Sequence, residues 1–217
     1  MNKVKKRSLC KEKIYLAALE VINTEGLEGL SMRRLALQLN VEAASLYNHV
    51  KNKSALLDLI QDSLFRELPS PKEQNNWKKY LWEFAQSIRH GLLKFPKTVP
   101  LFATRPSVTS SALEQTEKAF SMLHAAGFRY SDVIFAYQSL CVFILGHLQA
   151  EVGHTPGAKA EKEPSFSHVE NTIQFPHLMK AYSQSSFKNY DAWFDLGVTV
   201  IITGLEKVLE KTKRKKT

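Results

Sequence analysis

The sequence of 217 residues lacks several features that would place it in common classes of protein. It has two cysteines, Cys10 and Cys141, whose separation fits neither a metal-binding pattern nor a disulfide framework. A reducing cytoplasm is therefore the simplest expected compartment. No run of about 18 apolar residues occurs, and no apolar segment follows the charged start MNKVKKRS, so we expect neither a membrane-spanning helix nor a signal peptide.

Sequence signatures of enzymes are also missing. The chain has no nucleophile elbow, no glycine-rich phosphate loop and no spaced pair of carboxylates in a catalytic context. We therefore expect a protein that is not an enzyme and that needs no cofactor. Strand signals are nearly absent as well, whereas apolar residues recur at helical spacing along most of the chain. With 44% hydrophobic residues available for a core, the sequence predicts an all-α protein.

Positive charge is concentrated at the two ends of the chain. The net charge is +9, of which residues 1–53 carry +5 and residues 211–217 carry +5, while the residues between them carry −1. A basic N-terminal segment is what binding to a polyanion requires. The C-terminal run KTKRKKT is more simply explained as a solvated tail.

Helix signals divide the chain into a segment of short helices and a segment of longer ones. The predicted short helices are one that ends near Gly26, one at 31–39, one at 43–49, and one that begins at Asn52 or Ser54 and stops at Pro69. The predicted longer helices lie at about 74–95, 108–125, 131–152 and 187–212. Residues 153–168 have glycine, proline and charge without periodicity and are predicted to form a mobile loop.

The stretch LALQLNVEAASLYNHVKNKSALL, residues 35–57, combines an apolar stripe with an unusual set of polar residues. Two short helices joined by a tight turn form a helix-turn-helix, whose second helix enters the major groove of DNA. The leucines then hold the two helices together, and the polar side chains are explained if their partner is DNA. A plain amphipathic helical hairpin in an all-α protein would show the same periodicity.

The side chains of this stretch suit two kinds of contact. Ser45 and Asn48 can bond base edges, whereas Tyr47, His49 and Lys53 suit phosphates, which position the module without reading sequence. The remaining predicted DNA-binding residues are Ala43 and Ala44, whose methyl groups suit thymine methyls, Arg33 and Arg34, which suit the flanking backbone, and Ser31.

Longer patterns carry a resemblance to a known family. The run AALEVINTEGLEGLSMRRLALQLNVEAASLYNHVKNKSALLDLI resembles the DNA-binding module of the TetR family of bacterial repressors. The stretches FATRPS, LHAAGF, FILGHLQAE and FDLGVTVIITGLEKVLE resemble, in the same order, the C-terminal domain of the tetracycline repressor. The resemblance implies an all-α homodimer with a three-helix helix-turn-helix domain at 1–68, which reads a palindromic operator. A larger helical domain at 69–217 would then bind a small-molecule effector and dimerise.

The resemblance also assigns roles to individual residues. It places Ala43, Ala44 and Ser45 at the base-reading start of the recognition helix, and Arg33 at a position that contacts backbone or base. Tyr47, His49 and Lys53 match its phosphate-contacting positions. Ala43, Ala44 and Asn48 differ from the residues of the tetracycline repressor, so the operator sequence does not carry over. A protein of the same fold that binds DNA without any effector is the alternative.

The effector itself is expected to differ from tetracycline. The tripeptide TRP at 104–106 matches a piece of the tetracycline pocket, but Phe84, Leu101, and Leu68 or Pro69, stand where the family has polar or metal-binding groups. We therefore expect an apolar or aromatic effector. The predicted effector-binding residues are Phe84, Ile88, Leu92, Phe102, Arg105, Pro106 and Phe120, with plain core packing as the alternative.

Two further predictions concern the later helices. A four-helix bundle with two helices from each subunit would bury the apolar faces of 131–150 and 194–209, unless these faces form the core of one chain. The predicted dimer residues are Val133, Tyr137, Leu140, Ile144, Phe194, Val198, Ile201 and Leu205. His147, Glu151 and His154 are spaced as a metal site would be, but we expect Gly153 to end the helix and favour a solvated or interface cluster over a metal.

Overall fold

The computed structural model describes residues 9–72, 75–153, 174–184 and 189–214. Within these ranges the chain is helical and contains no strand, so the predicted all-α fold is confirmed. The elements are α1 (Lys11–Gly29), α2 (Met32–Leu39), α3 (Ala43–Tyr47), α4 (Lys53–Glu67), α5 (Trp77–Leu93), the 3₁₀ turn η1 (Pro96–Thr98), α6 (Val99–Thr104), α7 (Ser110–Ala125), α8 (Tyr130–Val152), α9 (Pro176–Gln184) and α10 (Tyr190–Arg214).

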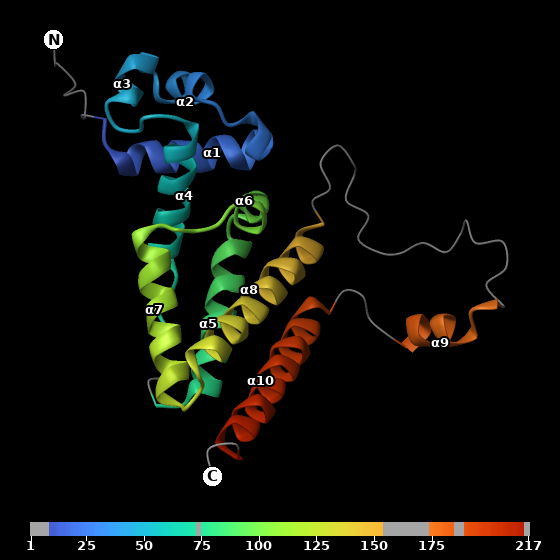
Figure 1. The fold of residues 1–217 in the computed structure, drawn as a ribbon. Coiled ribbons are helices and arrows are strands. Elements are labelled where there is room, and N and C mark those ends of the chain that lie inside the picture. Colours follow the sequence, from blue (N-terminus) through green and yellow to red (C-terminus); the bar gives the residue numbers. More distant parts are fainter. Residues whose placement is uncertain (1–8, 73–74, 154–173, 185–188, 215–217) are drawn as a thin grey trace.

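The first three helices form a small module at one end of the molecule (Figure 1). Helical backbone breaks at Gly26, whose φ of 80° lies in the left-handed region, so the predicted end of the first helix is confirmed. One further turn follows before Gly29. The core of the module is apolar: Ile14, Leu35 and Leu46 are fully buried, one from each helix.

Helix α4 connects this module to the rest of the chain (Figure 1). Its first turn is capped by Asn52, whose Oδ1 accepts a hydrogen bond from the Ala55 N–H at 2.8 Å. Leu56, Ile60 and Leu64 recur at helical spacing and are buried along one face. The same helix therefore packs in both parts of the protein.

Helices α5 to α8 and α10 form the larger helical part, in which α8 and α10 run side by side in opposite directions (Figure 1). Helix α5 begins later than predicted because Asn76 caps it: its Oδ1 accepts from the N–H groups of Lys78 and Lys79 at 3.0 and 3.2 Å. Gly153 ends α8 in the left-handed conformation, as predicted. The rest of the predicted 153–168 loop lies outside the described residues.

Two features of the fold were not predicted. Helix α9 has no counterpart among the predicted helices, and none of its residues is buried. Helix α8 is long and apolar enough to cross a membrane by length and composition alone. Its Val133, Leu140, Ile144 and Leu148 are fully buried against other helices, which accounts for one side of that apolar surface.

Candidate DNA-binding face and effector cavity

A tight turn holds α2 and α3 together as a helix-turn-helix. Asn40 adopts the left-handed conformation with φ of 51°, and its N–H is directed at the last carbonyls of α2. The Val41 N–H then donates to the Ala36 carbonyl at 3.0 Å. Leu35 of α2 and Leu46 of α3 are fully buried beside this turn. The residues of this turn therefore determine the orientation of α3 relative to α2.

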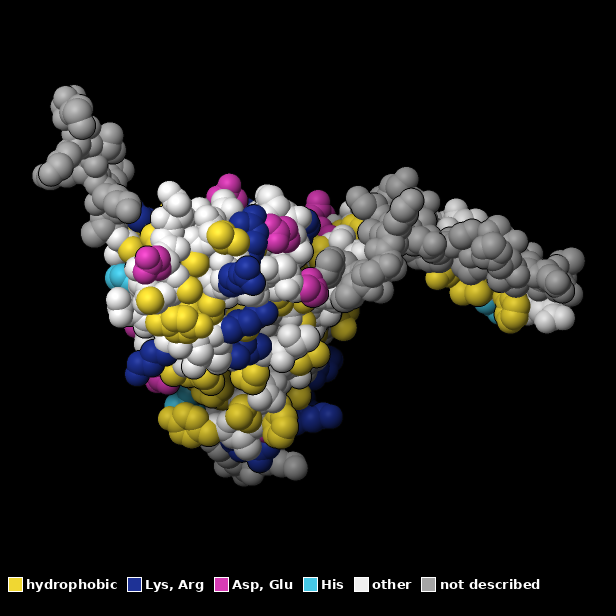
Figure 2. Space-filling view, turned by 90° about the horizontal axis from the view of Figure 1, so that it is seen from above, with side chains coloured by type: hydrophobic (Ala, Val, Ile, Leu, Met, Phe, Trp, Pro, Cys, Tyr) yellow, Lys and Arg dark blue, Asp and Glu magenta, His cyan; other side chains and the backbone are white. Residues whose placement is uncertain are grey.

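The predicted base-reading and phosphate-contacting residues lie on α3, in the turn that follows it and at the start of α4. Ala43 and Ala44 are exposed at the start of α3 and Tyr47 at its end. Asn48 after it and Lys53 at the start of α4 are exposed as well, whereas Ser45 and His49 are half-buried. Viewed from the side of this module, Lys and Arg side chains run in a line across the surface (Figure 2). The face thus combines short polar and methyl-bearing side chains with positive charge, as DNA recognition requires.

Two of the predicted DNA contacts also have partners within the chain. Arg34 was predicted to grip the DNA backbone, but its Nε lies 2.6 Å from Glu25 Oε1 and its Nη1 lies 3.1 Å from Gln38 Oε1. Its guanidinium therefore ties α2 to the end of α1. Ser31 is the N-cap of α2, since its Oγ accepts from the Arg34 N–H at 3.1 Å. Arg33 is exposed on the same helix.

A cavity of about 310 Å³ lies inside the larger helical part. Its wall is formed by Leu64, Phe65, Leu68, Ile88, Leu92, Phe102, Arg105, Pro106, Ser107, Ala112, Thr116, Tyr137, Gln138, Cys141, Ile144 and Leu145. Of the predicted effector residues, Ile88, Leu92, Phe102, Arg105 and Pro106 are in this wall. Such an apolar cavity with a few polar groups is typical of small-molecule sites.

The other two predicted effector residues lie behind the wall. The rings of Phe84 and Phe120 pack against the ring of Tyr137, with centroids 5.7 and 5.4 Å away. They support the cavity without lining it. Of the eleven lining residues that the sequence did not predict, five come from α8 and four from α4 and α7, because only the fold brings these helices to face one another across the cavity.

Three polar side chains, those of Thr116, Tyr137 and Cys141, line the cavity and are half-buried. The Tyr137 hydroxyl and Thr116 Oγ1 lie 2.9 Å apart and share a hydrogen bond. Burial raises the pKa of Tyr137, so this phenol stays protonated and can donate to a ligand. Burial also raises the pKa of the Cys141 thiol to about 11, which keeps it a neutral, weakly polar part of the wall.

The two cysteines are expected to differ strongly in reactivity. Because thiolates react and thiols do not, iodoacetamide at pH 8 should alkylate exposed Cys10 much faster than Cys141, by about a hundredfold given the raised pKa and burial of Cys141. Peptide mass spectrometry of the native protein over time measures both rates. Equal rates in the folded protein would show that Cys141 is not enclosed as described, and equal rates in urea serve as the control.

A second hollow lies on the outside of the molecule. It measures about 760 Å³ and is bounded by α1, the turn at His49–Lys51, α4 and the start of α7. Its lining mixes basic residues such as Lys11 and Arg66 with acidic residues such as Asp62 and Glu67. A groove of mixed charge lacks the apolar wall that encloses small ligands. The inner cavity is therefore the candidate effector site.

Each of the two parts of the chain matches the profile of a known protein family. The profile described as bacterial regulatory proteins, tetR family, matches residues 14–60, and the profile described as tetracyclin repressor-like, C-terminal domain, matches residues 68–209. The chain belongs to the TetR family. The resemblance drawn from the sequence motifs is thereby confirmed.

Individual relatives of this TetR-family protein cover nearly its whole length. It is 31% identical over 200 residues to an HTH-type transcriptional regulator of Saccharopolyspora erythraea, covering 91% of this chain and 84% of the relative. It is 31% identical over 217 residues to the class C tetracycline repressor of Escherichia coli, covering 96% and 93%. These relatives are transcriptional regulators, which confirms the expectation that the chain is not an enzyme.

Solved structures of the family share the fold. Apo ActR from Streptomyces coelicolor superposes with a TM-score of 0.78 at 26% identity, covering 96% of this chain and 98% of ActR. ActR in complex with actinorhodin gives a TM-score of 0.77 at 27% identity, covering 92% and 96%. Ligand-responsive transcriptional regulation is therefore the general function of this TetR-family regulator.

The residues predicted for the dimer interface lie largely inside one chain of the regulator. Val133, Leu140, Ile144, Phe194 and Val198 are buried, Tyr137 lines the cavity, and Ile201 and Leu205 are half-buried. Side chains already covered by their own chain cannot supply apolar surface to a partner. The buried residues therefore belong to the core of one chain, which was the alternative to the predicted interface. The exposed apolar residues of α8 and α10 lie on other faces of these helices.

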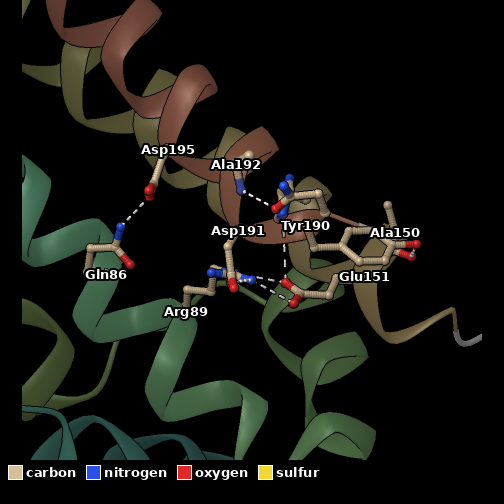
Figure 3. Close-up of polar contacts among 10 residues, drawn as sticks. Gln86, Arg89, Ala150, Glu151, Tyr190, Asp191, Ala192 and Asp195 are labelled. Atoms are coloured by element: carbon tan, nitrogen blue, oxygen red, sulfur yellow. Dashed lines mark hydrogen bonds and ion pairs between the residues drawn. The ribbon is translucent and has the colours of Figure 1, made fainter. Parts of the chain in front are cut away.

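A buried ionic cluster fastens the start of α10 to the regulator's core (Figure 3). Arg89 of α5 is 2% exposed, and its Nε and Nη2 donate to the two carboxylate oxygens of Glu151 on α8 at 2.8 and 2.7 Å. Its Nη2 also lies 2.7 Å from Asp191 Oδ1 on α10. The hydrogen bond to Glu151 raises the pKa of Arg89. Nearby, Gln86 Nε2 donates to Asp195 Oδ1 at 2.7 Å.

The same cluster contains two of the three residues with metal-site spacing, His147 and Glu151. His147 Nε2 lies 3.7 Å from Glu151 Oε2, so the predicted shared face of α8 is present, but both Glu151 oxygens already accept from Arg89. Burial lowers the pKa of His147, which favours its neutral form. His154 lies outside the described residues. Across the part of the chain that the structure describes, no three His, Cys, Asp or Glu side chains are placed to hold a metal ion.

Proposed function

We propose that this protein is a transcriptional repressor that acts in the cytoplasm as a homodimer. Its residues 1–68 bind a palindromic DNA operator through α3, and its residues 69–217 dimerise and bind a small apolar or aromatic effector that releases the DNA. The proposal is based mainly on the position of α4, which runs from the DNA-binding module to the cavity. Its Leu64 and Phe65 form part of the cavity wall, and its first residue, Lys53, is a predicted DNA contact.

The cavity supports an effector other than tetracycline. Its volume of about 310 Å³ and its mostly hydrocarbon wall suit a small apolar or aromatic molecule. Phe84 and Leu101, which stand where the tetracycline repressor has polar groups, are both buried in hydrocarbon. Similar structures hold different ligands: ActR was solved with actinorhodin, and a TetR variant of Acinetobacter baumannii was solved with minocycline.

Exposed apolar stripes on α8 and α10 support the homodimer. Phe135 and Val142 are exposed on α8, and the exposed apolar residues of α10 are Trp193, Leu196, Val200 and Val208. Gly146 and Gly204 lie on these stripes, and a Cβ atom added at either one would meet no atom within 4 Å. These glycines leave room for a partner helix to approach closely, as in a four-helix bundle.

The DNA-binding assignment is tested by separating base-reading from phosphate contacts. Operator fragments are first selected with the purified protein from random duplex DNA and sequenced. Lys53→Ala should then weaken binding to operator and to unrelated DNA about equally, and should reduce the slope of log K against log salt by about 2, because the dimer loses two phosphate contacts. Fluorescence anisotropy at several salt concentrations measures both quantities.

Two further substitutions complete this test. Ser45→Ala and Asn48→Ala should change the preferred bases in each half-site and leave the salt slope unaltered, since they remove hydrogen bonds to bases and no charge. Lys118→Ala is the matched control, because Lys118 is exposed on α7, in the larger helical part. If both α3 variants keep the affinity and the base preference of the wild type, α3 is not the recognition helix.

A further inference from the structure

Arg105 lines the cavity and also forms hydrogen bonds with residues of α4. It follows α6 directly and is part of the cavity wall. Its Nη2 nevertheless lies 2.6 Å from Asp58 Oδ1 and 2.8 Å from Ser54 Oγ, both in the first two turns of α4. Ser54 is the neighbour of Lys53, a predicted phosphate contact. One guanidinium therefore joins the cavity to the end of α4 that faces the DNA-binding module.

The rest of the segment after α6 is fastened to α4 as well. Gln61 is fully buried, and its Nε2 donates to Ser107 Oγ at 2.9 Å. One residue further along α4, Asp62 Oδ1 accepts from the Ser111 N–H at 3.0 Å. Polar contacts thus follow successive turns of α4 beside the cavity. These bonds would transmit a displacement of Arg105 or Ser107 to α4.

Arg105 is also the one charged residue among the described residues of the cavity wall. The other members are apolar or carry neutral hydroxyl, amide or thiol groups. Its Nε is buried without a hydrogen-bond partner in the structure. An unsatisfied buried donor on a cation is best met by a negatively charged oxygen, and a guanidinium binds a carboxylate with two parallel hydrogen bonds.

We propose that the effector is an aromatic acid whose carboxylate pairs with Arg105 and takes this guanidinium away from Asp58. This inference rests on the proposed ligand-responsive function and names the ligand class and the trigger. The exchange is favourable for a physical reason. The Asp58 side chain is 43% exposed and is rehydrated when it loses Arg105, whereas a carboxylate in the apolar cavity needs a cation beside it. Ligand and Asp58 therefore compete for one partner.

The test uses two probes of the same shape with full-length protein. Anthracene-2-carboxylate carries the acid, and anthracene-2-carboxamide is its neutral counterpart; binding of each is followed by the probe's fluorescence. Wild type should bind the acid at least about tenfold more tightly than the amide, the gain expected from hydrogen bonds to a charged group. Arg105→Gln should bind both probes equally, and Arg105→Lys should keep part of the preference because it keeps the charge without the fork.

The variant Asp58→Asn tests directly whether the ligand and Asp58 compete for Arg105. Removing the competing carboxylate should tighten binding of the acid by about threefold to tenfold and leave binding of the amide unchanged, because only the acid recruits Arg105. Arg129→Gln is the matched control: Arg129 pairs with Asp132 in the first turn of α8, and neither lines the cavity. Its probe affinities should equal those of wild type. Circular dichroism melting confirms that each variant is folded.

Several results would overturn the inference. They are equal affinity of wild type for both probes, a preference for the acid that survives Arg105→Gln, no effect of Asp58→Asn on the acid, or no binding of either probe. Operator release is measured in parallel. If the acid binds through Arg105 and DNA stays bound, the proposed repressor function fails while the site stands. If the amide releases DNA as well as the acid does, the site fails while the function stands.

Discussion

Replacing Val200 by Glu is expected to turn the homodimer into a folded monomer and to lower operator affinity by about a hundredfold to ten thousandfold, since binding to the two half-sites of one palindrome is no longer linked. Val200 is 60% exposed in one chain and lies at the centre of the α10 stripe. Two glutamates facing each other across a close apolar interface are neither hydrated nor paired, which strongly opposes association. Analytical ultracentrifugation and anisotropy with the selected operator measure the two effects.

The neighbouring residue supplies the control. Thr199 is exposed, and its Oγ1 donates to the Asp195 carbonyl of its own helix at 2.7 Å. One residue along a helix turns the side chain by about 100°, so Thr199→Glu adds the same charge off the stripe. It should remain dimeric and bind the operator normally. A dimeric Val200→Glu protein, or an equally monomeric Thr199→Glu protein, would show that the interface lies elsewhere.

The dimer helices illustrate what periodicity reveals and what it leaves open. The sequence identified α8 and α10 as apolar helices, but α8 is apolar on opposite sides: Val133 and Leu140 are buried, while Phe135 and Val142 are exposed. A sequence pattern cannot tell which of two apolar faces meets the core of its own chain. The choice of Tyr137 for the interface had the same cause, because its cavity position depends on the packing of α7 and α5.

Helix ends were predicted more reliably, because they depend on residues close together in sequence. Gly26, Ser31 and Asn52 mark helix ends through backbone conformation or capping, which depend on a few adjacent residues. The ion pair of Arg34 with Glu25 escaped prediction, because it forms across the turn between two helices. The contact of Arg105 with Asp58 joins residues far apart in sequence, so only the folded chain reveals it.

Arg89→Met is expected to lower the free energy of unfolding by about 3–5 kcal/mol, because Glu151 is left as a buried carboxylate without its partner. Asp191, whose side chain is 84% exposed, contributes little to this loss since water replaces the guanidinium. Urea unfolding at one fixed protein concentration measures the change, because dimerisation makes apparent stability depend on concentration.

A double variant separates lost charge pairing from lost packing. Arg89→Met with Glu151→Gln removes both charges, so it should recover a large part of the stability that Arg89→Met alone loses. Arg66→Met is the control for removal of an exposed arginine: the Arg66 side chain is 66% exposed, and its partner Asp62 keeps the hydrogen bond from the Ser111 N–H, so the change should cost at most about 1 kcal/mol. If Arg89→Met costs no more than Arg66→Met, the cluster does not secure α10. The dimer stripe on that helix would then need another support, because the ordered start of α10 is what presents Trp193 and Leu196 to a partner.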